Sequence, residues 1–237
     1  MTISFVIPAR NEEGFIKATL QAILAQPSYL IKEIILVDNG SSDQTVAVAM
    51  AVDPHIQVIH QLRPGVAPTK AAGLAMATGD IVACIDADTL IPPYWAIRVV
   101  EAFVRQPQLA AVSGPYLFNF DLLGRLLNSL FQVVMFVPTH ALVNWLGFMA
   151  VANGGNLAIR REALVDLGDY TEVVKFHGED AYLIRQVRRF GPVRFSPRFT
   201  AISSDRRICA VGRLQTVSSN VISWLAVALL GRPPRIS

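Results

Sequence analysis

Two aspartates, Asp86 and Asp88, stand one residue apart at the end of a short apolar run, Ile81 to Ile85, which follows Gly79 and Asp80. The run is too short for most helices and is typical of a buried parallel strand, and open α/β sheets bind ligands beyond the carboxyl ends of such strands. Neighbouring carboxylates repel each other, and a hard divalent cation relieves that repulsion while leaving positions for phosphate oxygens. The pair therefore indicates a metal and diphosphate site, although the Asp-x-Asp pattern also occurs in turns and helix caps.

Three further carboxylates stand at the ends of predicted elements. Asp38 follows the apolar run 34–37 and opens a turn whose Ser and Asp residues could also cap the next helix. Glu179 and Asp180 open a segment with helical spacing of its apolar residues, and the helix dipole alone favours carboxylates in a first turn. A catalytic and a purely structural interpretation of these residues both stay open at this point.

Alternating strand and helix patterns position these side chains. Strands are predicted at 3–8, 34–37, 56–59 and 81–85, with helices from residue 16, from residue 44 and over 65–78. Such alternation implies right-handed crossovers and a mostly parallel sheet with helices on both faces, so the fold class is α/β. Asp38 and the pair Asp86 and Asp88 then lie on one rim. The length of 237 residues is most simply one domain.

The second half of the chain continues with less regular patterns. We expect a helix over 96–105, a strand over 109–114, a strand and then a helix near residue 161, and short strands at 193–196 and 199–202. Asn153 and Gly154 belong to a Gly-rich turn before residue 156. Glycines there would let the backbone approach a substrate closely, but a plain structural turn explains them equally well.

Four segments in this order resemble the inverting family 2 glycosyltransferases of GT-A fold. They are Val6 to Glu12, Val37 to Asp43, Gly79 to Asp88, and Gly178 to Asp180. Each segment alone is a weak signal, but their shared order and spacing are specific, and the resemblance covers residues 2–200. The resemblance implies a Rossmann-like GT-A domain. It also implies a hexosyltransferase that transfers a sugar from a nucleotide-diphospho-sugar donor, inverts the anomeric carbon and uses Mg²⁺ or Mn²⁺.

The resemblance also implies where the donor binds. The nucleoside would lie against Asp38 and the loop after the first strand, with Pro8, Asn11 and Glu12 near it; a solvated loop is the alternative for the last two. Asp86 would face the ribose or the metal, and Asp88 would ligate the metal that bridges the diphosphate.

Other residues receive their roles from the same resemblance. Asp180 would be the general base that removes the proton of the acceptor hydroxyl, with Glu179 beside it. Lys70 stands where the family often has an Arg-Asn pair, and it would supply its charge to a phosphate. The sugar and acceptor pocket would include Asn153 and Gly154, and the diphosphate would be clamped by Arg206 and Arg207.

Composition suggests contact with a membrane. Hydrophobic residues make up 52% of the chain and the mean hydropathy is +0.42, which is high for a freely soluble enzyme. The apolar segments 118–152 and 217–232 are predicted to lie at a membrane interface, with ordinary core or a true span as alternatives. From Arg185 onward there are ten arginines and one acidic residue, which fits an anionic membrane, a phosphate-rich partner or a solvated basic face.

These features together predict a peripheral enzyme at the inner, cytoplasmic face of the cell membrane. No signal peptide precedes the first strand, and neither cysteine, Cys84 or Cys209, indicates a disulfide or a metal cluster. We expect a lipid-linked or membrane-presented acceptor, and a role in the synthesis of cell-envelope polysaccharide or glycolipid. Nucleic acid is not expected as a partner. The QxxRW signature of processive synthases is absent, which favours transfer of a single sugar. A nucleotidyltransferase and a non-catalytic membrane or partner-binding protein are the rival interpretations.

Overall fold

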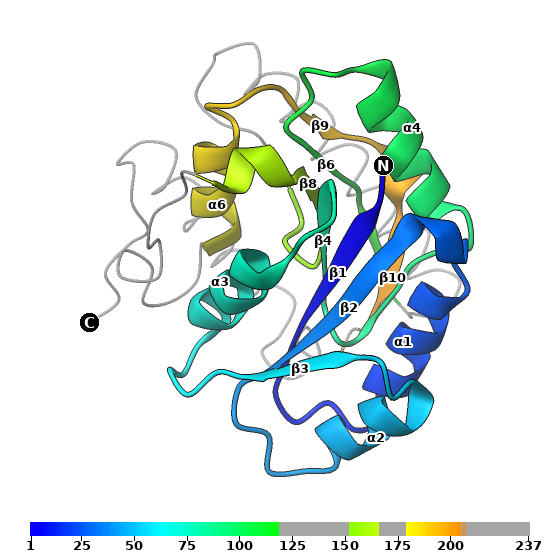
Figure 1. Cartoon of the computed structure of the whole chain (residues 1–237), viewed down its shortest axis with the longest axis vertical. Coiled ribbons are helices and arrows are strands. Elements are labelled where there is room, and N and C mark those ends of the chain that lie inside the picture. The colour runs from blue at the N-terminus through cyan, green and yellow to red at the C-terminus, as the bar shows by residue number, and fades with distance from the viewer. Residues whose placement is uncertain (119–151, 166–178, 205, 207–237) are drawn as a thin grey trace.

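A seven-stranded sheet forms the centre of the computed structural model, which describes residues 1–118, 152–165, 179–204 and 206 (Figure 1). The strand order is β3-β2-β1-β4-β8-β6-β9. Four neighbouring strands are parallel: β3 (Gln57–His60), β2 (Ile31–Asp38), β1 (Ile3–Ala9) and β4 (Ile81–Ile85). Strand β8 (Asn156–Arg160) is antiparallel to β4 and to β6 (Ala111–Ser113), and β9 (Val193–Phe195) is parallel to β6. The predicted α/β fold with a mostly parallel sheet is confirmed.

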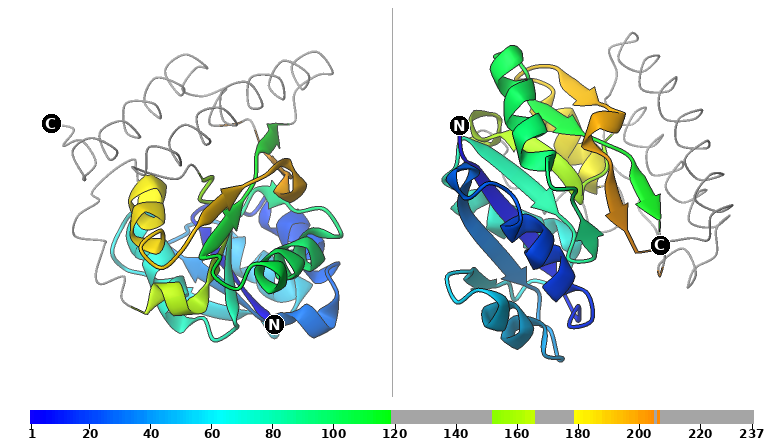
Figure 2. Two further views of the ribbon diagram at one scale, coloured as in Figure 1. Left: turned by 90° about the horizontal axis from the view of Figure 1, so that it is seen from above. Right: turned by 90° about the vertical axis from the view of Figure 1, so that its right-hand side faces the viewer.

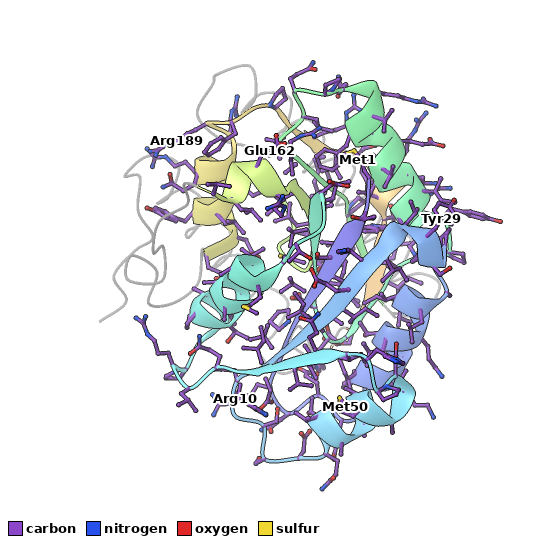
Figure 3. The ribbon with its side chains drawn as sticks, viewed as in Figure 1. Met1, Arg10, Tyr29, Met50, Glu162 and Arg189 are labelled. Atoms are coloured by element: carbon purple, nitrogen blue, oxygen red, sulfur yellow. The ribbon has the colours of Figure 1, made fainter. Side chains whose placement is uncertain are left out.

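Helices cover both faces of this sheet. One face carries α1 (Ile16–Leu24), α2 (Thr45–Val52) and α4 (Trp95–Arg105), and the other carries α3 (Val66–Met76) and α6 (Glu179–Val187). Figure 2 shows α4 and α6 on opposite sides of the strands. Because successive side chains of a strand point to opposite faces, Phe5 and Ile7 pack toward α1 while Val6 packs toward α3. Side chains fill both layers, and the central strands are therefore continuous apolar runs (Figure 3).

A small second sheet lies beside the first, with the order β5-β10-β7. It consists of β5 (Thr89–Leu90), β10 (Ala201–Ser203) and β7 (Tyr116–Phe118). Strand β10 runs antiparallel to β5 and parallel to β7. Since β5 follows Asp88 directly, this sheet fixes the chain that leaves the aspartate pair.

Several predicted boundaries were wrong. The strand predicted over 199–202 begins two residues later, because a 3₁₀ turn, Pro197–Phe199, precedes it and the Ser196 side chain accepts a hydrogen bond from the Arg198 N–H. Near residue 161 the structure has a 3₁₀ turn, Arg161–Leu164, in place of the predicted helix start. A third such turn, Ser28–Leu30, precedes β2.

The predicted membrane segments fall almost entirely outside the described residues, which include only 118 and 152 from the first segment and none of 217–232. Within the part of the chain that is described, no helix combines the length and the apolar character needed to cross a membrane.

Candidate active site

Asp38 is the last residue of β2 and is almost fully buried. Its Oδ1 accepts the Ser41 N–H at 3.1 Å, and its Oδ2 lies 3.3 Å from Nδ1 of His60 at the end of β3. The start of helix α2 at Thr45 is held by another residue of this turn, because the Thr45 N–H donates to Asp43 Oδ1 at 3.0 Å, so the residue that caps the helix is not Asp38. The carboxylate instead organises the loop at the rim where the predicted nucleoside site lies.

Asn39 also shapes this loop, although the sequence analysis assigned it no role. Its side-chain amide donates to the carbonyls of Gln61 and Arg63, both at 2.8 Å, and its oxygen accepts the Gly65 N–H at 2.9 Å. One amide therefore ties the end of β2 to the segment that leads into α3. Its position in a run of turn-forming residues concealed this long-range role.

The loop after β1 is anchored to the loop after β2. Asn11 has a positive φ of 57°, its N–H donates to Ser41 Oγ at 3.0 Å, and its side-chain oxygen accepts the Ser42 N–H at 2.8 Å. Glu12 is buried, and its N–H donates to Thr45 Oγ1 at 2.7 Å. The solvated-loop alternative is therefore wrong for Glu12. Pro8 lies within β1, opposite Val37 of β2.

Asp86 and Asp88 follow β4 and contact different neighbours. The Tyr116 hydroxyl donates to Asp86 Oδ2 at 3.4 Å, whereas Asp88 accepts a hydrogen bond from the Ser204 hydroxyl. Between them, the carbonyl of Ala87 accepts the buried Thr19 hydroxyl of α1 at 2.8 Å, which fixes the turn. Burial, followed by the charge of Asp86, raises the pKa of Tyr116 well above its usual value, so this phenol stays a hydrogen-bond donor.

Arg206 closes the first of two ionic clusters on this rim. It forms an ion pair with Glu12, its Nε lies 3.3 Å from Asp88 Oδ2, and its guanidinium stacks 4.6 Å from the Phe15 ring centroid. Burial alone would lower the pKa of Arg206, but its bonds to Glu12 and the charge of Asp88 raise it. Arg206, which was predicted to bind the diphosphate, thus contacts the carboxylates of Glu12 and Asp88 in this structure. Arg207, the second residue of that prediction, lies outside the described residues.

The second ionic cluster joins α3 to the start of α6. Lys70 Nζ donates to Asp180 Oδ1 at 2.5 Å and lies 3.9 Å from Glu179 Oε1. Burial, followed by the neighbouring charge of Asp180, raises the pKa of Glu179 although Lys70 opposes the shift. The two carboxylates therefore do more than complement a helix dipole, and they contact a cation from another element.

The Gly-rich turn Asn153–Gly155 brings its backbone against two of the carboxylate residues, Asp180 and Asp86. The Gly154 N–H donates to Asp180 Oδ2 at 3.2 Å, and the Gly155 carbonyl accepts the Asp86 N–H at 3.1 Å. A Cβ at Gly154 would overlap the Asp180 carboxylate, and one at Gly155 would overlap that of Asp86. Both glycines are required by these close approaches, so the turn is more than a plain connection.

A buried amide that the sequence analysis missed supports this turn. Asn156 accepts the Trp95 indole N–H at 3.0 Å and donates to the carbonyls of Phe199 at 2.6 Å and Gly114 at 3.2 Å. The Asn153 amide donates to the same Gly114 carbonyl at 2.8 Å. A polar residue directly before the apolar residues Leu157 to Ile159 was the available signal.

Of the predicted site residues, Pro8, Asp38, Asp86 and Asp88 stand at or just beyond the carboxyl ends of β1, β2 and β4. The glycine turn contacts both Asp86 and Asp180, Lys70 contacts Asp180, and Arg206 contacts Asp88, so side chains from other elements join this rim. No group of three or more His, Cys, Asp or Glu side chains with the geometry of a metal site occurs among the described residues. The arrangement brings the carboxylates of Asp86, Asp88 and Asp180 together with the cations Lys70 and Arg206 and the backbone of the glycine turn.

Comparison with known proteins identifies the family. The sequence model of "Glycosyl transferase family 2" matches residues 4–168 of the chain. The chain belongs to glycosyl transferase family 2. Within this family, the poly-beta-1,6-N-acetyl-D-glucosamine synthase of Staphylococcus aureus (strain MSSA476) is 30% identical over 175 residues, which cover 70% of this chain and 41% of the relative. The Staphylococcus epidermidis enzyme of that name is 32% identical over 115 residues, 47% of this chain and 28% of the relative. The family 2 chain thus spans less than half the length of these relatives.

Solved structures show the same fold. The glucosyl-3-phosphoglycerate synthase of Mycobacterium tuberculosis, in complex with Mn²⁺, uridine diphosphate and phosphoglyceric acid, has a TM-score of 0.68 and 22% identity, and the match covers 99% of this chain and 80% of that one. A second structure of that enzyme, with Mg²⁺ and uridine diphosphate, has a TM-score of 0.60 and 21% identity, and covers 99% of this chain and 81% of that one. Because the sequence identities are only 21% and 22%, the structural similarity establishes the GT-A fold of this chain and nothing about its substrates.

Proposed function

We propose that this family 2 protein transfers a single sugar from a nucleotide-diphosphate sugar to an acceptor, with inversion at the anomeric carbon. The observation that carries the proposal is the placement of Asp180 and Asp86 against the glycine turn, on the rim that also holds Asp38 and Asp88. The uridine diphosphate in the structural relatives supports a nucleotide donor at this rim.

A divalent cation, Mg²⁺ or Mn²⁺, is proposed at Asp88 with Asp86 beside it. The residues fit such an ion, because carboxylates are hard oxygen ligands and the missing Cβ at Gly155 leaves room for the Asp86 side chain. The present partners of Asp88 are the side chains of Arg206 and Ser204, which rotamer changes can release. When bound, the ion would stabilise the charge that develops on the departing diphosphate.

The residues of this chain would divide the remaining work of a displacement. As the acceptor oxygen bonds to the anomeric carbon, the bond from that carbon to the diphosphate oxygen breaks and its electron pair leaves with the diphosphate. Asp180 would take the proton of the acceptor hydroxyl. Asp38 would hold the nucleoside, with Pro8, Asn11 and Glu12 on the facing loop, and Asn153 with Gly154 would line the sugar pocket.

Transfer of one sugar, rather than polymer extension, remains a proposal that rests on the missing QxxRW signature. The staphylococcal relatives are named as synthases of poly-N-acetyl-D-glucosamine, so UDP-N-acetylglucosamine is the first donor to test. Of the rival functions, the nucleotidyltransferase is disfavoured by the position of Asp180 at the glycine turn. The non-catalytic binding protein is disfavoured because such a protein needs no carboxylate there.

We also propose that the acceptor is lipid-linked or presented by a membrane at its inner, cytoplasmic face. Strands β7 and β10 run parallel and pair Phe118 with Ser203, so the sequences after them, both rich in apolar residues, start from neighbouring strand ends. Ser204 contacts Asp88, which places these strand ends next to the proposed metal site. Leu90 and Ile202, paired across the same sheet, are 36% and 45% exposed.

The donor site is tested by thermal unfolding of the full chain with UDP, GDP, dTDP and CMP, each with and without Mn²⁺. A ligand at a hundredfold excess over its Kd stabilises the native state by about 2.7 kcal/mol, which raises the midpoint visibly. We expect a Mn²⁺-dependent rise with one diphosphate that Asp88→Ala abolishes and Asp80→Ala retains. Asp80 is a matched control because it lies at the opposite end of β4 and its side chain is 54% exposed. Absence of any rise in folded protein would favour the non-catalytic binding protein.

The membrane proposal is tested by sedimentation with vesicles. The full chain should sediment with vesicles containing anionic phospholipid at low salt, and less with neutral vesicles, because arginines are concentrated from Arg185 onward. A chain that stays in the supernatant with both kinds of vesicle would contradict membrane presentation, while leaving the donor site untouched.

A further inference from the structure

Lys70 is a buried lysine in the middle of α3. Its side chain is only 3% exposed, which is rare for lysine because an unpaired ammonium loses its hydration on burial. Gly73, one turn later on α3, has no room for a Cβ against Val6 of β1 and Val37 of β2. The helix therefore lies close on the sheet, and this contact fixes the Cα from which Lys70 reaches the rim.

Carboxylates hold the ammonium in place. Nζ lies 2.5 Å from Asp180 Oδ1 and 3.9 Å from Glu179 Oε1. Burial alone would lower the pKa of Lys70, but the charges of Asp180, Asp86 and Glu179 raise it well above the usual value. The lysine is therefore a permanent cation whose shortest contact is to Asp180.

Asp180 is in turn held at both of its oxygens. Oδ1 accepts the Lys70 ammonium, and Oδ2 accepts the Gly154 N–H at 3.2 Å. Gly154 belongs to the turn that Asn156 and Ser113 fasten to the sheet, with the Ser113 hydroxyl accepting the Asn153 N–H at 3.0 Å. Only 32% of the Asp180 side chain is exposed. A lysine from α3 and a backbone amide from the turn thus define where this carboxylate points.

We propose that Lys70 is a positioning residue that acts on the reaction through Asp180, and that it is not a ligand of the donor's phosphates. Its charge is already engaged by two partly buried carboxylates, and a partner in a largely desolvated ion pair is costly to remove. This inference rests on the proposed function, in which Asp180 takes the proton of the acceptor.

The two roles of Lys70 predict different kinetics for Lys70→Met. A positioning role predicts that turnover, measured as UDP released from UDP-N-acetylglucosamine, falls about 100-fold, because an error on the order of 1 Å in a reacting group costs about that much. The Kd of UDP with Mn²⁺, measured by calorimetry, should change less than about threefold. Lys70→Arg, which retains a cation, should recover part of the turnover, and Lys17→Met, at an exposed lysine of α1, should match the parent protein.

A tenfold or larger increase in the Kd of UDP with Mn²⁺ would overturn the proposal and make Lys70 a phosphate ligand. Unchanged turnover in Lys70→Met would overturn it as well. Because a purely structural defect would not separate turnover from nucleotide affinity, the split between the two constants is the deciding result.

A thermodynamic cycle of unfolding tests the same pairing without any substrate. We expect Lys70→Met to lower the urea midpoint, because Asp180 then lacks its counter-ion, and the double variant Lys70→Met/Asp180→Asn to regain stability relative to Lys70→Met. If Lys70→Met does not fold, the double variant and Lys70→Arg complete the comparison. If the losses of stability in Lys70→Met and Asp180→Asn simply add in the double variant, the pairing of Lys70 with Asp180 is overturned. If the two losses are coupled but the parent protein has no transferase activity, only the proposed function has failed.

Discussion

Gly154→Ala is the sharpest test of the glycine turn. A Cβ at this position would lie well within 3.0 Å of the Asp180 carboxylate, a distance that real Cβ atoms essentially never show. Gly154 does not have a positive φ, so alanine can adopt the backbone conformation and only the contact changes. The carboxylate must retreat by on the order of 1 Å, which should lower turnover about 100-fold.

The assay compares turnover and UDP binding in Gly154→Ala and Gly14→Ala. Gly14 is a matched control because it too lacks a positive φ and a Cβ there meets nothing within 4 Å. We expect Gly14→Ala to keep the parent activity, and Gly154→Ala to lose turnover while its Kd for UDP with Mn²⁺ stays within about threefold. If Gly154→Ala keeps turnover within about threefold of the parent, the close approach of turn and carboxylate has no role in the reaction.

Three other substitutions test the charge and packing of the rim. Burial raises the folded-state pKa of Glu179, so the contribution of this residue to stability is present below the usual value of 4.5 and is lost as the pH rises through the folded pKa. In urea unfolding, Glu179→Gln should therefore stabilise the protein at pH 8 and not at pH 4. Stabilisation at pH 4 and not at pH 8 would contradict a raised pKa. Arg206→Gln should tighten Mn²⁺ binding in electron paramagnetic resonance titrations, because the guanidinium no longer competes for Asp88, and weaker binding would argue for a supporting role. Asn156→Ala should cost at least about 2 kcal/mol of unfolding free energy, since it removes the hydrogen-bond partner of the Trp95 indole and of the Phe199 carbonyl, and a loss below about 0.5 kcal/mol would show that water replaces the amide.

The parallel half of the fold could be predicted from sequence because its strands are buried on both faces. Runs such as 34–37 and 81–85 are continuously apolar, and predicted helices alternate with them along the chain. That alternation implies a mostly parallel sheet, whatever its strand order, with Asp38, Asp86 and Asp88 at one rim. The positions of these three residues needed no knowledge of distant contacts.

The antiparallel half and the ion pairs could not be predicted in this way. Strand β8 lies between β4 and β6, although β6 precedes it in the sequence, and no local pattern encodes that insertion. Lys70 stands in an Ala-rich helix and its partner Asp180 is 110 residues away. Arg206 and Glu12 are 194 residues apart. Pairings over such separations depend on tertiary packing, which local residue patterns do not contain.

Charge balance across the two ionic clusters explains why the rim should require a cation to accept its donor. Lys70 faces Asp86, Glu179 and Asp180, while Arg206 faces Glu12 and Asp88. Five carboxylates therefore meet two cations, and a diphosphate would bring further negative charge into a partly desolvated place, where repulsion is weakly screened. A divalent ion at Asp88 would supply the missing positive charge and release Arg206 to face the diphosphate. Binding of UDP should therefore depend strongly on Mn²⁺ in the parent protein, and that dependence should weaken when Asp88 is replaced by asparagine, which removes one negative charge but keeps an oxygen ligand.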